Sequence, residues 1–99
     1  MGDYIVAPVA RDDLLEIWDY YASELENVDL ADRIRDELFA AFDRLAQSPG
    51  IGHFRRDLAT EPLRFWQVRK YLVVYRDENC PIEIVRVLHV RRDVQALLE

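Results

Sequence analysis

Residues 63–89, LRFWQVRKYLVVYRDENCPIEIVRVLH, decide the fold because their pattern predicts three β-strands in close succession. β-Branched and aromatic residues dominate three short runs, as expected of strands in a half-buried sheet. These runs are residues 63–68, 71–76 and 82–89. Only Arg69 and Lys70 separate the first two runs, and five residues separate the last two. Because connections this short join antiparallel neighbours, we predict a three-stranded antiparallel meander.

The last run has apolar residues on both faces, which is typical of an inner strand. Regular alternation places Ile82, Ile84 and Leu88 on one face, and Val85 and Val87 on the other. Arg86 shares the first of these faces, where an unpaired guanidinium would be costly. We therefore expect Arg86 to be partly buried and paired, or to line a concavity, with Glu83 and Asp93 as the nearby acids.

Upstream of the strands, the hydrophobic period changes to that of a helix. One apolar stripe begins at Leu14, and a second begins at Leu30 and continues for about 20 residues, or about 30 Å. Asn27 is placed to cap the second helix. The Ser-Pro-Gly segment at 48–50 ends it, because proline disfavours a helical conformation at the residue before it. The two helices are expected to pack as an antiparallel hairpin.

Three further segments complete the predicted order of elements. Residues 4–7 predict a first strand, residues 51–62 lack any period and predict a loop, and the tail from residue 91 predicts a turn or two of helix. The order strand, helix, helix, strand, strand, strand predicts an α+β fold in a single domain over residues 1–99. In this fold a helical hairpin packs on a mostly antiparallel four-stranded sheet, and a short C-terminal helical tail follows.

Charge is distributed unevenly along the chain, whose net charge is −6 and whose pI is about 4.9. Residues 1–49 hold four arginines against twelve acids, whereas residues 50–99 hold nine bases against seven acids. Since nucleic-acid-binding domains usually carry a basic footprint, we do not expect direct nucleic-acid binding. The sequence has no apolar run near the roughly 20 residues of a membrane span, no signal-peptide features and a single cysteine, so we expect a cytoplasmic protein without membrane contact.

Side chains for covalent or metal chemistry are scarce in the sequence. Both serines lie in or at the end of a predicted helix, without the context of a catalytic nucleophile. Cys80, His53 and His89 lack the spacing of metal ligands, and no glycine-rich phosphate loop is present. We therefore expect no metal and no cofactor. The acidic pairs at 12–13 and 36–37 are interpreted as solvated helix surface.

What remains is a set of basic residues on the predicted sheet and at its flanks. The set comprises Arg64, Arg69, Lys70, Arg76, Arg86, Arg91 and Arg92, with His89 beside them. Ion pairing with nearby acids such as Asp77 explains any one of them as well as partner binding does. Trp66 fits the core better than it fits an exposed anchor. Tyr20 lies off the main stripe of the first helix, where it is free to contact a partner.

Three segments resemble a known family: LAQSPGIG at residues 45–52, PLRFWQVRKYLVVYRD at 62–77 and IEIVRVLHVRRDVQALL at 82–98. Together with the order of elements, they resemble the ParE/RelE superfamily of toxins from type II toxin–antitoxin modules, over residues 4–98. The similarity is greatest to the ParE, or plasmid stabilisation, branch. It implies a cognate antitoxin, ParD-like or similar, and a toxin–antitoxin hetero-oligomer.

The superfamily uses two mechanisms, which place different demands on the chain. RelE-like toxins cut messenger RNA in the ribosome, which requires an acid, a base and cations for the developing phosphorane charge. ParE-like toxins instead poison DNA gyrase. At the positions that RelE-like toxins use, this chain keeps Arg64 and Arg92 but has Trp66 and Leu72 at two others. Residues 94–99 contain neither Tyr nor His.

The resemblance therefore implies a ParE-like toxin that inhibits DNA gyrase or topoisomerase by protein–protein binding, with no catalytic residue. Two alternatives stay open. One is a RelE-like endoribonuclease with a degenerate site, for which the candidates are Arg64, His89 and Arg92. The other is an inactive relic that only binds its antitoxin. The candidate residues for partner binding are Tyr20, Arg64, Trp66, Arg86, His89, Arg91 and Arg92.

Overall fold

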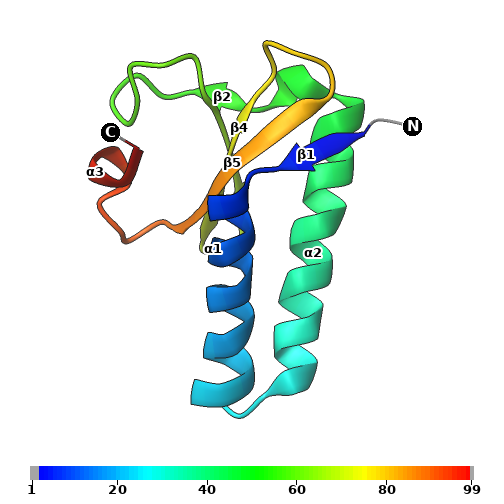
Figure 1. The fold of residues 1–99 in the computed structure, drawn as a ribbon. Coiled ribbons are helices and arrows are strands. Elements are labelled where there is room, and N and C mark those ends of the chain that lie inside the picture. Colours follow the sequence, from blue (N-terminus) through cyan, green and yellow to red (C-terminus); the bar gives the residue numbers. More distant parts are fainter. Residues whose placement is uncertain (1–2, 99) are drawn as a thin grey trace.

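The computed structural model of the protein describes residues 3–98, with a helical hairpin on one face of a sheet and a short helix on the other (Figure 1). The strands are β1 (Tyr4–Val6), β2 (His53–Phe54), β3 (Arg64–Val68), β4 (Tyr71–Arg76) and β5 (Ile82–His89). The helices are α1 (Pro8–Asp19), α2 (Val28–Gln47) and α3 (Val94–Leu98). A π-helical turn, η1 (Tyr20–Glu24), continues α1, and a 3-10 turn, η2 (Pro49–Ile51), follows α2. None of the helices described has the length and apolar content to cross a membrane.

The five strands lie in the order β1-β5-β4-β3-β2, with β1 parallel to β5 and every other neighbouring pair antiparallel. The predicted α+β class and the meander are confirmed, and β5 is an inner strand. The predicted number of four strands is wrong, because residues 53–54, assigned to a loop, pair with β3 as a fifth strand. Two residues are too few to show the alternation by which a strand is recognised in sequence.

The turn between β3 and β4 places an arginine in a backbone conformation that arginine rarely adopts. Arg69 has a φ of 54°, in the left-handed region that glycine or asparagine usually occupies in such turns. Gln67 Nε2 donates a hydrogen bond to the Arg69 carbonyl oxygen at 2.9 Å, and the Arg69 guanidinium binds both carboxylate oxygens of Glu37 in α2, at 2.7 and 2.8 Å. Glu37, interpreted as solvated surface, is therefore an ion-pair partner that attaches the turn to the hairpin.

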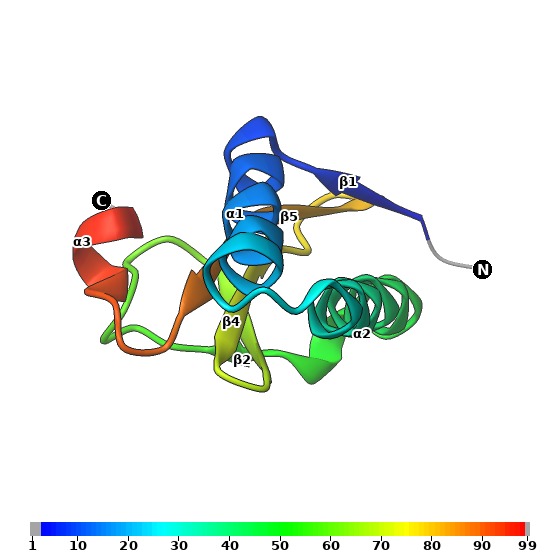
Figure 2. The same ribbon diagram turned by 90° about the horizontal axis from the view of Figure 1, so that it is seen from below.

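The helical hairpin forms as predicted. Asn27 caps α2, since its side-chain oxygen accepts a hydrogen bond from Leu30 N at 3.0 Å, and the helix ends at Gln47, before the Ser-Pro-Gly segment. Trp18 Nε1 donates a hydrogen bond to Asp32 Oδ1 at 3.0 Å, which links α1 to α2. Seen from below, the two helices lie side by side along the same side of the sheet (Figure 2).

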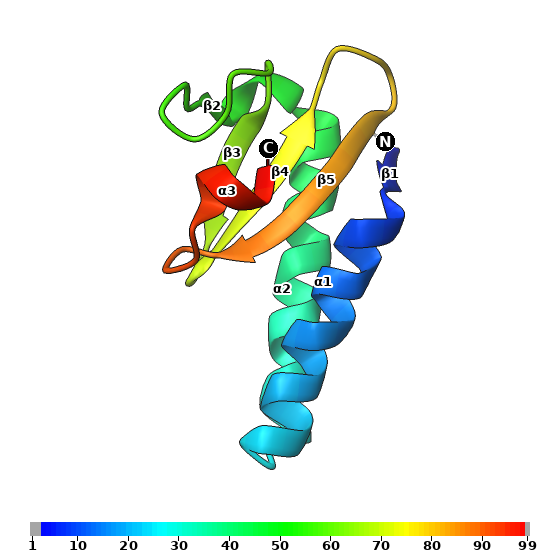
Figure 3. The ribbon, with the colours of Figure 1, turned by 60° about the vertical axis from the view of Figure 1, so that its left-hand side comes forward.

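Hydrophobic cores pack on both faces of the sheet. The first lies between the sheet and the hairpin and includes Ile34, Leu38, Phe42, Leu45, Tyr71, Val73, Tyr75, Ile82, Ile84 and Val87. On the other face of the sheet, where α3 lies (Figure 3), the second core includes Leu63, Phe65, Leu72, Val74, Leu88 and Val94, and residues of the segment 55–62 pack against it. Neither face of the central strands is therefore open to solvent.

A β-bulge in β5 decides which of its side chains face which core. The register shifts between Val74 and Tyr75 of β4, so Val85 of β5 is an extra residue. Because the bulge reverses the alternation, Leu88 belongs to the second core while Ile84 belongs to the first. The prediction that these two residues share a face is therefore wrong, since strict alternation holds only in a regular strand.

Candidate functional site

The residues predicted to bind a partner do not form one site. Tyr20, His89 and Arg92 line a common cleft, and Arg91 lies exposed beside His89. The remaining three, Arg64, Trp66 and Arg86, do not line this cleft. The structure therefore groups part of the set and separates the rest.

The cleft has a volume of about 340 Å³ and lies between the end of α1, including its π-helical turn, and the ends of β4 and β5. We call it the tyrosine cleft; its lining includes Ile17, Tyr20, Tyr21, Lys70, Tyr71, His89 and Arg92. The rings of Tyr20 and Tyr21 pack edge to face with their centres 5.1 Å apart. Tyr71 Oη donates a hydrogen bond to Tyr21 Oη at 3.3 Å. Burial, together with this hydrogen bond, raises the pKa of Tyr71, so its hydroxyl stays protonated at neutral pH.

The strand side of the tyrosine cleft is basic. Lys70 lies in the β3–β4 turn and Arg92 follows β5, and a hydrogen bond of 2.8 Å from Val90 N to the Lys70 carbonyl oxygen joins the two segments. The Nδ1 of His89 accepts a hydrogen bond from Arg91 N at 3.0 Å. When the ring is neutral, this contact leaves Nε2 as its N–H donor. Several hydrogen-bond donors are thus present on one side of the cleft.

Arg86 is paired, as predicted, but with an acid that the sequence did not indicate. Its Nε and Nη2 donate hydrogen bonds to Oδ2 and Oδ1 of Asp13 at 2.8 and 3.0 Å, and this contact raises the pKa of Arg86. Asp13 is only 5% exposed, so its interpretation as solvated surface is wrong. The two acids that were expected to pair with Arg86 have other partners. Glu83 lies 3.8 Å from Arg76, and Asp93 accepts a hydrogen bond from Ala96 N in α3.

The open edge of β5 explains why Asp13 is buried. β1 pairs with β5 only from Ile82 to Ile84, so the backbone beyond has no strand partner on that side among the residues that the structure describes. Asp13 Oδ2 accepts a hydrogen bond from Val87 N at 3.0 Å. One carboxylate therefore satisfies both a strand-edge N–H group and the guanidinium of Arg86, and it fixes α1 against the sheet.

Arg64 stabilises the segment that contains β2. Its Nε donates a hydrogen bond to Asp77 Oδ2 at 2.8 Å, and its Nη1 donates one to the Gly52 carbonyl oxygen at 3.0 Å. The guanidinium carbon also lies 4.1 Å from the centre of the Phe54 ring, a cation–π contact. These three contacts occupy Arg64 within the fold.

Of the three candidates for ribonuclease chemistry, Arg64 lies apart from His89 and Arg92. Arg64 pairs in register with Tyr75 of β4, whereas His89 pairs with Tyr71. Four residues of strand separate these positions, which is about 13 Å at about 3.3 Å per residue. Arg92 lies with His89 in the tyrosine cleft, and Arg64 is held by its own partners near the far end of the strand.

Trp66 packs against the first core, in agreement with the interpretation that the sequence favoured. The guanidinium of Arg44, from α2, lies over its ring at 5.3 Å from the centre. The indole is therefore partly covered by a helix and does not stand out as an anchor for a partner.

A second concave surface lies between α1 and α2. We call it the α1/α2 groove; it has a volume of about 380 Å³ and is formed by Arg11, Leu14, Leu15, Trp18, Arg35 and Phe39. Leu15 is 64% exposed and Phe39 is 37% exposed, so apolar surface is open to solvent here. At about 100° per residue, Leu15 and Trp18 lie on the face of α1 opposite to Ile17 and Tyr20. The groove and the tyrosine cleft are therefore on opposite sides of α1.

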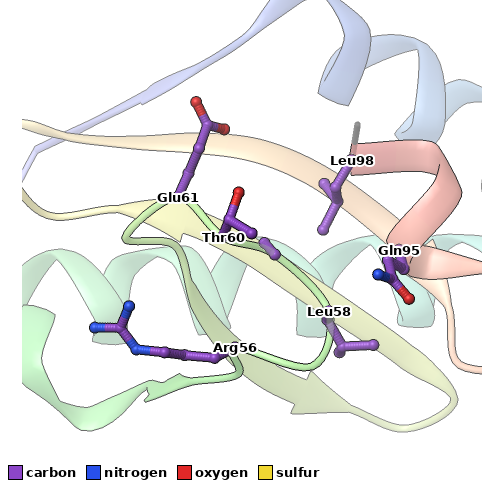
Figure 4. Close-up of a pocket in the computed structure, with 7 residues that line it drawn as sticks. Arg56, Leu58, Thr60, Glu61, Gln95 and Leu98 are labelled. Atoms are coloured by element: carbon purple, nitrogen blue, oxygen red, sulfur yellow. The ribbon is translucent and has the colours of Figure 1, made fainter.

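A third cavity, of about 420 Å³, lies between the segment 56–61 and α3 (Figure 4). Leu58 and Leu98 line it and also pack against the second core, so the cavity separates the two segments that cover this core. None of the residues predicted for a site lines it. Within residues 3–98, no three His, Cys, Asp or Glu side chains are grouped so that they could hold a metal ion.

Comparison with known proteins assigns the chain to a family. A family model described as the ParE toxin of the type II toxin–antitoxin system, parDE, matches residues 4–94. The chain belongs to the ParE toxin family. Toxin ParE1 of Mycobacterium tuberculosis, in strain CDC 1551 / Oshkosh and in strain ATCC 25618 / H37Rv, is 36% identical to it over 92 residues, which cover 92% of each chain.

A solved structure agrees on the fold of this ParE-family chain. A chain from the chromosomal ParDE TA system of P. aeruginosa aligns with a TM-score of 0.75 and 20% identity, over 90% of this chain and 96% of that one. The family inferred from the three quoted sequence segments and the class of toxin in type II toxin–antitoxin systems are thereby confirmed.

Sequence reasoning missed three features of this ParE-family chain. Asp13 stands beside another acid on a helix, a pattern that indicates solvent, and its partner Arg86 is distant in the sequence. Tyr21 follows Leu14 by seven residues and so falls on the apolar stripe of the first helix, although it also lines the tyrosine cleft. The sequence did contain a signal for the exposure of Leu15, because two successive leucines point about 100° apart on a helix and cannot both lie at the centre of one core stripe.

Proposed function

We propose that this ParE-family toxin inhibits DNA gyrase, or a related topoisomerase, by protein–protein binding and does not cleave RNA. The separation of Arg64 from His89 and Arg92 carries the proposal, because general acid–base cleavage needs its groups around one phosphate. The sheet face under α3 supports it too, since that face is filled by the apolar side chains of the second core. The buried residues of that core are all apolar, so they supply no cation to stabilise the charge of a phosphorane.

The proposal is tested with one preparation of the chain in two assays. Purified chain is added to a DNA gyrase supercoiling assay and to a cell-free translation reaction. We expect inhibited supercoiling and undisturbed translation. In cells, induced expression is expected to produce filaments and a DNA-damage response while bulk protein synthesis continues. Prompt translation arrest with cut messages would support the ribonuclease alternative, and a chain that binds its antitoxin but is inert in both assays would be a relic.

We further infer that a cognate antitoxin, ParD-like or similar, neutralises the toxin by laying an amphipathic segment over the α1/α2 groove, in a toxin–antitoxin hetero-oligomer. The groove presents Leu15, Trp18 and Phe39 next to one another, the kind of apolar surface into which a helical segment lays its apolar face. Arg11 at the groove, which pairs with no acid within residues 3–98, supplies charge for an acid at the edge of such a segment, whereas Arg35 is shared with Asp32 and Asp36 of α2. The toxin acts in the cytoplasm, where its proposed target lies.

The antitoxin site is tested by isothermal titration with the antitoxin encoded beside the toxin gene. Leu15→Asp places a charge in the groove and is expected to weaken binding at least about tenfold. Leu25→Asp is the matched control, because Leu25 is also exposed but does not line the groove. The affinity of the Tyr20→Asp chain for the antitoxin tests whether the antitoxin also contacts the other side of α1. Equal affinities for the Leu15→Asp and Leu25→Asp chains would contradict the assignment of the groove.

A further inference from the structure

Basic residues gather on the strand side of the tyrosine cleft. Lys70, Arg91 and Arg92 form no ion pair with any residue in the range 3–98, although the chain carries a net charge of −6. Arg69, the neighbour of Lys70, is by contrast held by Glu37. Lys70 and Arg92 line the cleft from two segments that a backbone hydrogen bond joins, so they form a basic rim along its strand side, and Arg91 adds an exposed charge next to Arg92.

The acids around the cleft do not neutralise this rim. Asp13 lines the cleft, but Arg86 and Val87 N use both of its oxygens. Glu16, on the α1 wall, is the other acid in the lining, and it makes no ion pair with a described residue. The cleft thus has a basic side at the strand ends and a weakly acidic side on the helix.

The interior of the cleft offers apolar contact and a hydroxyl donor. Val87 is buried and Ile17 is half-buried, whereas Tyr20 is 49% exposed, so a ligand would meet an aromatic wall that solvent reaches. Tyr21 Oη accepts the hydrogen bond from Tyr71, which leaves its own proton available for an acceptor on a ligand. A cleft of about 340 Å³ is at the lower end of the range for small-molecule pockets and has room for a few side chains.

These features favour a short acidic segment of a protein over a nucleic acid. A nucleic-acid strand would extend past the rim toward a half of the chain with twelve acids and four arginines, where its phosphates would be repelled. A peptide with one apolar residue between carboxylates matches the arrangement of aromatic wall, apolar floor and basic rim. Lys70 and Arg92 come from different segments of the chain, so each can bind one of the two carboxylates that flank the apolar residue.

We propose that the tyrosine cleft is a docking site for an acidic segment of a partner protein. One apolar side chain of the segment packs against Tyr20 and Ile17, and flanking carboxylates bind Lys70 and Arg92. The inference rests on the proposed action by protein–protein binding, and it assigns the chemistry of the segment recognised. Binding is expected to weaken with salt, because the basic rim is exposed to solvent.

The test is a peptide titration followed by NMR on the isolated chain. The probe is acetyl-Glu-Asp-Phe-Asp-Glu-amide, and its matched control is acetyl-Gln-Asn-Phe-Asn-Gln-amide, which keeps the apolar residue and removes the charges. We expect the acidic peptide to shift the amide signals of residues 20–21, 70–71 and 89–92 and to bind at least about tenfold more tightly than the control. Equal binding of the two peptides, or no binding of the acidic one at low salt, would overturn the proposal.

Two charge-reversal variants locate the site. Lys70→Glu combined with Arg92→Glu is expected to reduce affinity for the acidic peptide at least tenfold. Arg33→Glu combined with Arg56→Glu changes the net charge equally but lies outside the cleft, and it is expected to leave the affinity within about twofold. Equal losses in both variants would mean that net charge alone attracts the peptide. A single-stranded oligonucleotide that binds more tightly than the peptide, with the same sensitivity to Lys70 and Arg92, would also overturn the assignment.

The outcome is independent of the proposed target. A chain that binds the acidic peptide but does not inhibit gyrase would support the docking site in the cleft and contradict gyrase as the target. A chain that inhibits gyrase but does not bind the peptide would support gyrase as the target and contradict the docking site in the cleft. Tyr20→Ala adds a third readout, since it removes the aromatic wall without changing charge and is expected to weaken binding of both peptides.

Discussion

At the scale of single residues, one buried carboxylate controls how the hairpin meets the sheet. Asp13 binds Arg86 with two hydrogen bonds and also satisfies Val87 N at the open edge of β5. The side chains of the pair are 7% and 16% exposed, so solvent screens them little. Removal of either partner leaves the other charge buried without compensation.

Asp13→Ala is therefore expected to lower the free energy of unfolding by about 3–5 kcal/mol, as found when a buried ion pair loses one member. Arg86→Ala and Arg86→Lys are both expected to be strongly destabilised, because lysine cannot reproduce the bidentate contact. The measurement is denaturant unfolding, with Asp12→Ala as the exposed neighbouring control. If Arg86→Ala kept its stability and lost toxicity, Arg86 would belong to a partner-binding surface instead.

A second cluster of residue-scale contacts holds the segment before β2. Tyr75 Oη donates a hydrogen bond to the Pro49 carbonyl oxygen at 2.6 Å and accepts one from Gly52 N at 2.9 Å. A Cβ atom on Gly52 would lie 2.7 Å from Tyr75 Cε1 and 2.8 Å from Cζ, closer than carbon atoms approach, whereas one on Gly50 would meet nothing within 4 Å. Glycine is required at position 52 for close approach and is not required at 50.

Gly52→Ala is thus expected to destabilise the fold by about 1–3 kcal/mol, because Tyr75 must move and its buried hydrogen bonds are lost. Gly50→Ala is the matched control, with an expected effect within about 0.5 kcal/mol. Thermal unfolding compares the two chains. Similar midpoints for both would show that the segment yields to the added methyl group without breaking its contact with Tyr75.

At the scale of elements, the β3–β4 turn depends on a helix that is remote in the sequence. Arg69 is held in its left-handed conformation while its guanidinium binds Glu37 of α2. This hydrogen bonding to Arg69 lowers the pKa of Glu37 below its ordinary value of 4.5. The folded state thus binds fewer protons at Glu37 than the unfolded state does near that pH.

The stability that this pair contributes is expected to be fully present above the ordinary pKa of Glu37 and to be lost as the pH falls through the lowered value. Glu37→Gln should therefore unfold more easily than the unaltered chain at pH 6, and the difference should shrink below about pH 4. Because the pair is about 40% exposed, the effect is expected to be small. Glu24→Gln, at an exposed acid of η1, is the control, and a parallel pH profile for all three chains would contradict the role of the pair.

At the scale of the whole molecule, α1 separates two surfaces of different character. The α1/α2 groove is apolar with an arginine on each helix, and the tyrosine cleft is aromatic with a basic rim. The two surfaces share no lining residue. A toxin of this size can therefore present separate sites to two segments of one partner or to two partners.

The separation makes a prediction for binding. Leu15→Asp is expected to weaken antitoxin binding while leaving the affinity for the acidic peptide within about twofold, because sites without shared contacts act independently. Both affinities are measured on the same Leu15→Asp preparation by titration. A parallel loss of both would indicate that the two surfaces are coupled through α1.

The sequence by itself determined the elements and the family. The hydrophobic periods, the Asn27 cap and the Ser-Pro-Gly stop are local signals, so the helices, β4 and β5 follow from residues close to one another in the chain. Three quoted segments were enough to indicate the ParE toxin family, which residues 4–94 confirm. Tertiary structure decided the fifth strand, the bulge at Val85 and the pairing of Asp13 with Arg86. These features depend on which backbone groups remain unsatisfied once the sheet has formed, and a local pattern does not contain that information.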